Sequence, residues 1–331
     1  MKVLKFGGSS LADAPRYMRV MEISTATHQT DGAAVVLSAP KGVTNALSLL
    51  CEQAAANEDF QPLFNKLNDT VTGIANNLNE ELDGFAHASV VEFINSHLSV
   101  LKQHLEGIKL LGVAPDNVAA GILSIGEYIS VTLFSAMLSA KGIANRVIDP
   151  VKYVLAEGDY LDSIADVSLS KARFSDVPTD GSEFLVMPGF VAANEAGEKV
   201  TLGRNGSDYS AAILAACIDA NCCEIWTDVD GVYNADPNQV EGAVLLDKLT
   251  YQEAMELSYF GAKVLHPKTI GPIAQHHIPC LIRNTLNPAA PCLAASFSNS
   301  SIVRGGNSRT LNFLVKYGSK TFSPSGRVIV L

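Results

Sequence analysis

The order of apolar and polar residues predicts an α/β protein, because short apolar runs alternate with longer stretches of helical period. The run at 33–37 is continuously apolar, as expected for a strand covered on both faces. Residues 46–115 are expected to be mainly helical, with apolar residues spaced for one buried face. This stripe consists of Leu98, Leu101, Leu105 and Ile108. Further strands are expected at 3–6, 145–149, 183–190, 199–202, 224–227 and 279–282.

Residue types that begin helices mark further elements. Asp13 and Pro15 predict a helix start just after the first strand. Another helix is expected over 120–140. Thr250 and Glu253 have the spacing of a capping box, in which each side chain satisfies a free N–H group of the other residue. A helix is therefore expected to begin there.

The stretch 199–227 is interpreted as one βαβ unit. The strand at 199–202 enters a glycine turn, a helix follows over 209–220, and the next strand runs parallel to the first. Ser207 or Asp208 is expected to be the N-cap of the helix.

Both turns of this unit are expected to face ligands. The first places Arg204 and free backbone N–H groups at a helix N-terminus, where anions bind. The second ends a strand with Asp228, Asp230 and Tyr233 at the sheet edge where α/β proteins usually bind ligands. Two such turns suggest an enzyme that handles two anions.

A phosphate cradle is indicated at the end of the first strand. Gly7, Gly8 and Ser9 form a turn before a helix, and glycine lets backbone N–H groups approach a phosphate closely. The spacing is not that of a Walker A motif, and a Gly-Gly turn alone is better explained by an ordinary tight loop. Lys5 favours the cradle, because packing does not explain a lysine at the end of so short a strand.

Glu127 is a charged residue within the mostly apolar helix expected over 120–140. It could lie at a solvated edge, or it could project into a pocket and bind an ammonium group. The residues themselves leave both interpretations open.

Composition limits the classes of function. The length of 331 residues allows two domains or one large sheet with additions. Of these residues, 47% are hydrophobic and 18% are charged, which is enough apolar material for a sizeable core. The net charge of −10 argues against a nucleic-acid partner, which would need a basic face. No signal peptide and no stretch of about 18 apolar residues are evident, so a cytoplasmic protein without a membrane partner is expected.

The six cysteines are expected to be reduced and mostly buried, because none forms a CxxC pair. His276, His277 and Cys280 lie near one another in sequence, but no second ligand pair stands at zinc spacing. A metal site is therefore not favoured.

Taken together, six motifs in order resemble the amino acid kinase superfamily, and within it the aspartate kinases. They lie at 5–10, 38–45, 126–127, 202–209, 226–237 and 260–267. The stretches 222–226 and 251–267 look most like the kinase portion of the bifunctional aspartokinase/homoserine dehydrogenases. The resemblance covers roughly residues 1–295.

The resemblance implies a three-layer αβα sandwich with a mainly parallel sheet. It also implies phosphoryl transfer from MgATP to the side-chain carboxylate of L-aspartate, the first step toward lysine, threonine and methionine. ATP and Mg²⁺ are the implied cofactors, with Mg²⁺ carried by ATP and no metal held directly by the protein. L-Aspartate and ATP are the implied partners, and homodimer formation is left open.

The chemistry of the side chains agrees with this reaction. A carboxylate is already ionised near neutral pH and needs no general base, so positioning and cations must carry the catalysis. Lys5 and Lys263 would supply charge to the phosphates, with Asp208 holding the lysines in place. The cradle of Gly7, Gly8 and Ser9 would supply backbone N–H groups.

The amino acid and the nucleotide are expected to bind different side chains. Arg204 can hold the substrate α-carboxylate through two hydrogen bonds, Glu127 can accept its ammonium, and Thr44 can hydrogen-bond it. By resemblance, the nucleotide site is lined by Thr227, Asp228, Tyr233, Lys263 and Val264.

The chain is expected to divide at about residue 297. Residues 1–297 would form the kinase domain, with the aspartate site in its N-terminal part and the nucleotide site in about 200–297. Residues 298–331, rich in Ser, Asn and Gly at first, are interpreted as a truncated tail, a remnant of a linker and the start of a regulatory ACT domain. Asn238 stands where the family often has Arg or Lys, which removes one cation near ATP.

Two alternatives to aspartate kinase remain open. One is a sister kinase of the same superfamily that acts on glutamate, acetylglutamate, carbamate or UMP. Arg204 and Glu127 favour an α-amino acid with both head groups free. The other is a truncated, non-catalytic remnant, which the change in composition after Phe297 would fit.

Overall fold

The computed structural model describes residues 1–229, 231, 242–246, 248–259, 266–290 and 293–296. Its centre is an eight-stranded sheet with the order β10-β12-β11-β9-β1-β2-β6-β3. Every neighbouring pair is parallel except β11 and β12, which are antiparallel. The strands are β1 (Lys2–Phe6), β2 (Ala33–Leu37), β3 (Asn145–Val147), β6 (Phe184–Pro188), β9 (Cys222–Thr227), β10 (Lys248–Thr250), β11 (Cys280–Asn284) and β12 (Leu293–Ser296).

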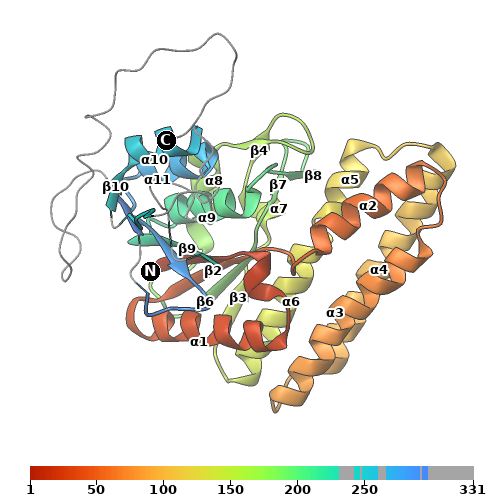
Figure 1. Ribbon diagram of the computed structural model, residues 1–331, viewed down its shortest axis with the longest axis horizontal. Coiled ribbons are helices and arrows are strands. Elements are labelled where there is room, and N and C mark those ends of the chain that lie inside the picture. Colours follow the sequence, from red (N-terminus) through yellow and green to blue (C-terminus); the bar gives the residue numbers. More distant parts are fainter. Residues whose placement is uncertain (230, 232–241, 247, 260–265, 291–292, 297–331) are drawn as a thin grey trace, which may run out of the picture.

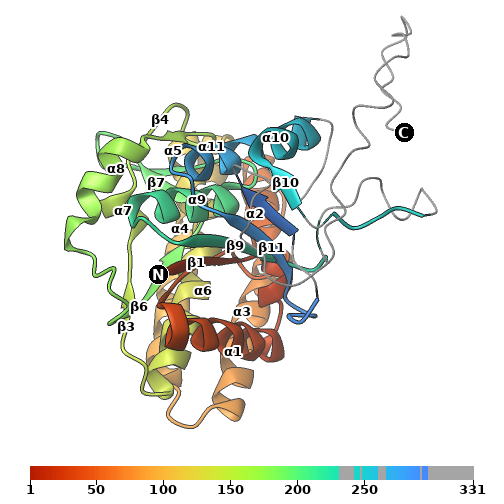
Figure 2. The same cartoon turned by 90° about the vertical axis from the view of Figure 1, so that its left-hand side faces the viewer.

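Helices cover both faces of this sheet, which confirms the predicted αβα sandwich (Figures 1 and 2). One layer contains α1 (Ala14–Asp31) and α6 (Ile125–Ala140). The other contains α7 (Pro150–Tyr153), α8 (Val167–Arg173), α9 (Gly206–Cys217), α10 (Tyr251–Tyr259) and α11 (Pro267–Gln275). Asp13 caps α1 by accepting a hydrogen bond from the Arg16 N–H group at 3.0 Å, as its sequence predicts. Thr250 and Glu253 form the expected reciprocal capping box.

The two hydrophobic cores follow from the period-2 alternation of the central strands. In β2 all five side chains are buried. Ala33, Val35 and Leu37 belong to the core beneath α1 and α6, whereas Ala34 and Val36 belong to the core beneath α9 and α11. A strand buried on both faces reads as continuously apolar, as the sequence of this segment does.

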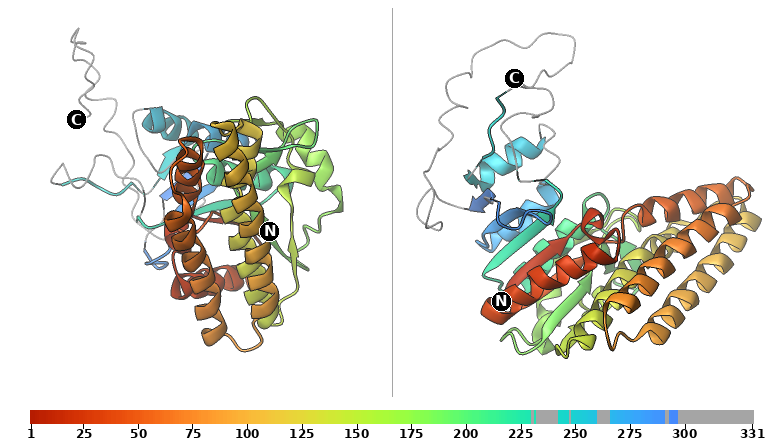
Figure 3. Two further views of the ribbon diagram at one scale, coloured as in Figure 1. Left: turned by 90° about the vertical axis from the view of Figure 1, so that its right-hand side faces the viewer. Right: turned by 60° about the horizontal axis from the view of Figure 1, so that its bottom comes forward.

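A lobe of long helices projects from one end of the sandwich (Figures 1 and 3). It contains α2 (Val43–Ala55), α3 (Gln61–Glu81), α4 (His87–Leu111) and α5 (Asp116–Leu123). The predicted stripe on α4 is buried as expected. The lobe matters for function because α5 packs against strand β8 (Lys199–Thr201) and so brings the lobe back to the sandwich.

The single helix expected over 120–140 is in fact two helices, α5 and α6, which meet at Ser124. Its hydroxyl donates to the Gly121 carbonyl at 2.7 Å, a local side-chain bond that competes with helix continuation. By length and composition alone, the segment 116–140 would be able to cross a membrane, a test that the buried core helices of other proteins also pass. Within this fold, 67% of the apolar 18-residue stretch in this segment is buried. Its second helix, α6, packs against β6 and α1.

The predicted βαβ unit is wrong in its first strand. β8 pairs with β7 (Val191–Ala193) in a separate antiparallel sheet, whereas β9 lies in the main sheet between β1 and β11. Phe190 has a positive φ of 71° directly after β6, which turns the chain away from the main sheet before β7 begins. A further two-stranded sheet pairs β4 (Ala156–Glu157) with β5 (Ile164–Ala165).

Candidate active site

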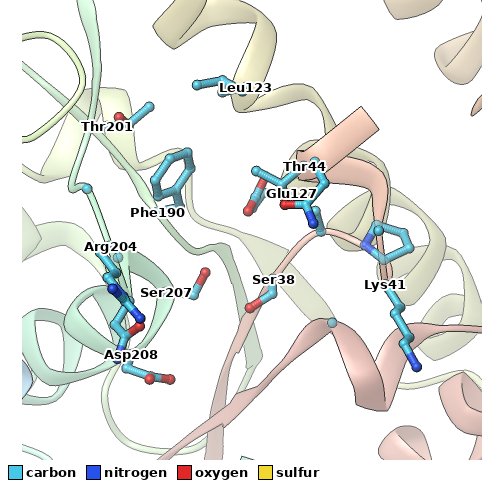
Figure 4. Close-up of a pocket in the computed structure, with 18 of the residues that line it drawn as sticks. Ser38, Lys41, Thr44, Leu123, Glu127, Phe190, Thr201, Arg204, Ser207 and Asp208 are labelled. Carbon is cyan, nitrogen blue, oxygen red and sulfur yellow. The ribbon is translucent and has the colours of Figure 1, made fainter. Parts of the chain in front are cut away.

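A pocket of about 600 Å³ opens at the carboxyl ends of β1 and β2, the edge where open α/β sheets bind ligands (Figure 4). Its walls come from the loops after these two strands, from the turn between β8 and α9, and from the junction of α5 and α6. Seven residues predicted from the sequence lie together in this lining. They are Lys5, Gly8, Ser9, Thr44, Glu127, Arg204 and Asp208.

The lining of the pocket contains an ion pair between two elements distant in sequence. Lys5 Nζ on β1 lies 2.6 Å from Asp208 Oδ1 on α9, and the two side chains are only 11% and 14% exposed. Gly7 is outside the lining but supports the pair, because a Cβ there would lie 3.4 Å from Lys5 Nζ. The geometry therefore fixes the lysine beside the Gly7–Ser9 turn, as the sequence predicts.

The expected N-cap of α9 needs correction. The helix begins at Gly206, and the capping residue is Asn205, in the left-handed conformation with φ 57°. Gly206 is needed for close approach, because a Cβ there would lie 2.6 Å from Phe190 Cδ2. Since the N-cap lies two residues before Ser207 and three before Asp208, both of these residues lie in the first turn of the helix and line the pocket.

Glu127 lies in the pocket, in the first turn of α6, and is only 3% exposed. Burial raises its pKa to about 8, although a hydrogen bond from the Ala39 backbone and the charge of Lys5 act in the opposite direction. Its Oε2 atom has no hydrogen-bond partner among the described residues. A buried carboxylate oxygen without a partner is a suitable acceptor for a ligand cation.

The position of Glu127 depends on the glycine that precedes it. A Cβ at Gly126 would lie 2.5 Å from Ala39 Cβ and 2.8 Å from Val43 Cγ1. Only glycine therefore lets the start of α6 approach the loop after β2. This contact brings Glu127 and Thr44 to the same wall of the pocket (Figure 4).

Arg204 lines the opposite wall from Thr44 (Figure 4). Its turn is tightly built, because Gly203 has φ +71° and a Cβ there would lie 1.8 Å from Asp162 Oδ1. Asp162 in turn pairs with Lys268 of α11 at 2.5 Å. The pocket thus presents a guanidinium opposite a carboxylate, with the Lys5–Asp208 pair between the strand ends.

Several lining residues were not singled out from the sequence as site residues. Ser38 and Lys41 belong to the motif at 38–45, which directly follows the apolar run at 33–37. Nothing in the sequence marks Phe190 or Thr201 as a site residue. Phe190 follows a Pro-Gly turn, and Thr201 ends a short strand. Examples are Ser38, Lys41, Leu123, Phe190, Thr201 and Ser207.

Two of the residues expected to bind nucleotide, Thr227 and Asp228, lie outside this lining. Thr227 and Asp228 are at the carboxyl end of β9 and do not line this pocket, and Asp228 is exposed. The Thr227 carbonyl accepts from the Thr285 N–H group at 2.8 Å, and the Thr285 hydroxyl lies 2.7 Å from that of Ser10. These bonds tie the end of β9 to the Gly-Gly turn. Tyr233, Lys263 and Val264 lie outside the described residues.

In the part of the chain that the structure describes, no group of three or more His, Cys, Asp or Glu side chains is placed to hold a metal ion. The five described cysteines are buried free thiols. His276, His277 and Cys280 accordingly form no such group.

Comparison with known proteins places this geometry in a family. The amino acid kinase family profile matches residues 1–284. A bifunctional aspartokinase/homoserine dehydrogenase of Buchnera aphidicola subsp. Acyrthosiphon pisum is 48% identical over 288 residues, covering 87% of this chain and 35% of the relative. Its counterpart from Haemophilus influenzae is 46% identical over 291 residues, covering 88% and 36%. The chain therefore spans about a third of the length of these curated relatives.

Solved structures agree with the sequence comparison. The crystal structure of E. coli aspartokinase III in complex with aspartate and ADP has a TM-score of 0.81 at 29% identity, covering 90% of this chain and 65% of that one. The same enzyme with lysine and aspartate has a TM-score of 0.78 at 28% identity, covering 91% and 65%. On the sequence profile, the relatives and the shared architecture together, the chain belongs to the amino acid kinase family.

Proposed function

We propose that this chain is an aspartate kinase, which transfers the γ-phosphoryl group of ATP to the side-chain carboxylate of L-aspartate and yields 4-phospho-L-aspartate. The observation that carries the proposal is one pocket in which Glu127, with an oxygen that has no hydrogen-bond partner among the described residues, lies opposite Arg204, with the Lys5–Asp208 pair nearby. Similarity to proteins named aspartokinases, one of them solved with aspartate and ADP, supports it.

The head groups of the amino acid suit the two walls of the pocket. Glu127 would accept the α-ammonium through its free oxygen, and the Thr44 hydroxyl would add a hydrogen bond. Arg204 would bind the α-carboxylate in a planar, two-bonded pair, for which a guanidinium is better shaped than an ammonium. The side-chain carboxylate would then point toward Lys5 and the Gly-Gly turn.

The chemical step needs charge stabilisation and alignment more than proton transfer. A carboxylate oxygen forms a bond to the γ-phosphorus while the bond from that phosphorus to the β–γ bridging oxygen breaks, and ADP takes the electron pair. Lys5 would stabilise charge on the transferred group, with Asp208 holding the amine in position at 2.6 Å. Backbone N–H groups of the Gly7–Ser9 turn would contact the phosphate oxygens.

The nucleotide is proposed to bind beyond this pocket, at the carboxyl end of β9. Thr227 and Asp228 are the described candidates there, and Tyr233, Lys263 and Val264 are carried over from the resemblance. Mg²⁺ would arrive bound to the ATP phosphates. Homodimer formation and a cytoplasmic location also remain proposals, the latter supported by the buried free thiols.

An acceptor series tests the proposed function. ADP release would be followed with MgATP and, in turn, L-aspartate, L-glutamate, N-acetyl-L-aspartate, N-acetyl-L-glutamate, carbamate and UMP. We expect turnover with L-aspartate and little with N-acetyl-L-aspartate, which lacks the ammonium that Glu127 would bind. Turnover with another acceptor would favour a sister kinase, and no turnover with any acceptor would favour the non-catalytic alternative.

A further inference from the structure

Lys41 occupies the corner of a well-defined turn at the rim of the pocket. The Val43 N–H group donates to the Pro40 carbonyl at 3.0 Å, and Gly42 has φ 84° and ψ −11°. These values are those of the third residue of a type II turn, which requires a positive φ and favours glycine. A Cβ at Gly42 would meet nothing within 4 Å, so this glycine serves the turn geometry and not packing. Lys41 is therefore held at the second position of the turn.

The turn packs directly on the proposed phosphate cradle. A Cβ at Gly8 would lie 2.8 Å from the Ala39 carbonyl oxygen and 3.5 Å from both the N and Cα atoms of Lys41. Lys41 also lines the pocket, on the side away from Arg204 and Asp208 (Figure 4). The Gly7–Gly8 turn is thus next to both lysines, because Gly7 approaches the Lys5 amine and Gly8 approaches the Lys41 backbone.

The charges of the pocket leave Lys41 available for an anion. Three cationic side chains of the described residues line it, namely Lys5, Lys41 and Arg204. Lys5 is paired with Asp208, and Arg204 is opposite Glu127 and suited to a carboxylate. The Lys41 amine has no ion pair or hydrogen bond with any residue that the structure describes.

We propose that Lys41 binds the oxygens of the phosphoryl group as it passes from the nucleotide to the carboxylate, and so acts as an additional catalytic cation. This inference rests on the proposed function and concerns the same site. The transferred group carries negative charge on three oxygens, and the charge of Lys5 is already offset in part by Asp208, so a further cation beside Lys5 would stabilise this group. A flexible amine on the far side of the cradle would contact the oxygens that Lys5 does not face.

Kinetic variants test this role. Lys41→Met should lower kcat roughly 10- to 100-fold while changing the KM for aspartate by less than about threefold, because the lost contact is to the phosphoryl group. Lys41→Arg keeps the charge and should recover most of the loss. Lys66→Met serves as the control, because Lys66 is exposed on α3 and outside the pocket lining. A kcat within about twofold of wild type for Lys41→Met, or an effect confined to the KM for aspartate, would overturn the inference.

A binding measurement separates this inference from the proposed function. Calorimetric titrations of wild type and Lys41→Met would compare a non-hydrolysable ATP analogue with ADP, each with Mg²⁺ and aspartate. We expect the variant to lose at least about fivefold in affinity for the analogue and little for ADP, which lacks the γ-phosphoryl group. Equal losses for both nucleotides, or no loss for either, would exclude the role of Lys41. An inactive wild type would sink the proposed function while this comparison remained informative.

Discussion

Single residues decide which ligand each wall of the pocket can bind, and Arg204 gives the simplest case. Arg204→Lys keeps the positive charge but removes the planar fork that matches a carboxylate. The KM for aspartate should rise by a factor that corresponds to a loss of roughly 1–3 kcal/mol in binding free energy, the value of a hydrogen bond to a charged group. The KM for ATP should stay within about twofold. Equal increases in both constants would show that Arg204 does not bind the α-carboxylate.

Glu127 links aspartate binding to pH. Its pKa is raised to about 8 by burial, whereas only the ionised form can pair with an ammonium. The KM for aspartate should therefore fall as the pH rises from about 6.5 to about 8 and then level off. Measuring that constant across this range tests the assignment, and Glu127→Gln should give a higher and nearly flat profile. A flat wild-type profile would contradict it.

The same residue makes a prediction about stability without ligand. Between the usual glutamate pKa of 4.5 and the folded value of about 8, the folded protein binds a proton that the unfolded chain has lost. The stabilisation is complete below the lower pKa and declines as pH rises through the upper one. Wild type should lose this stabilisation between about pH 6 and pH 9, whereas Glu127→Gln has no carboxyl group to ionise. The unfolding free energy of the variant minus that of wild type should therefore be roughly 2–3 kcal/mol larger at pH 9 than at pH 6. Urea titrations of both proteins at both pH values would measure this difference in unfolding free energy. If the difference were the same at both pH values, Glu127 would ionise as an ordinary exposed acid.

At the scale of elements, the site depends on the contact between the start of α6 and the loop after β2. Gly126→Ala would place a methyl group 2.5 Å from Ala39 Cβ, so it should destabilise the protein by about 1–3 kcal/mol through overpacking. It should also raise the KM for aspartate by moving Glu127. Gly121→Ala on the neighbouring helix is the matched control, because a Cβ there meets nothing within 4 Å. Alanine is a better helix former than glycine, so the control should be neutral or stabilising.

Thermal melts of the two glycine variants test this contact. We expect a lower melting temperature for Gly126→Ala only. If both variants melted like wild type and bound aspartate normally, the position of Glu127 would not depend on the close approach.

Elements were predictable from sequence where local chemistry decides them. The continuous apolar run of β2, the Asp13 cap and the Thr250–Glu253 capping box all formed as expected. The pairing of β8 was not predictable in this way, because the partner of a three-residue strand is set by where the chain turns. The positive φ of Phe190 directs β7 and β8 away from the main sheet, and aromatic residues give no signal for that conformation.

The lining of the pocket was predictable to the extent that it comes from strand ends. Lys5 and Glu127 stood out as charges in apolar surroundings, and the structure brings them into one pocket. Leu123 and Thr201 were missed because they line it through the contact of α5 with β8, segments far apart in the sequence. Such contacts depend on tertiary packing, which local pattern does not encode.

At the scale of the whole molecule, the central claim is that this chain makes an acyl phosphate with Lys5 as the catalytic cation. The most direct test traps the product with hydroxylamine, since an acyl phosphate gives a hydroxamate. Wild type should form aspartyl hydroxamate only with both MgATP and L-aspartate. Lys5→Ala should lower the rate roughly 10²- to 10⁴-fold with a cooperative melt retained. Lys171→Met, which removes a lysine from the exposed pair with Asp219, should match wild type. Absence of hydroxamate from wild type, or a wild-type rate for Lys5→Ala, would contradict the account.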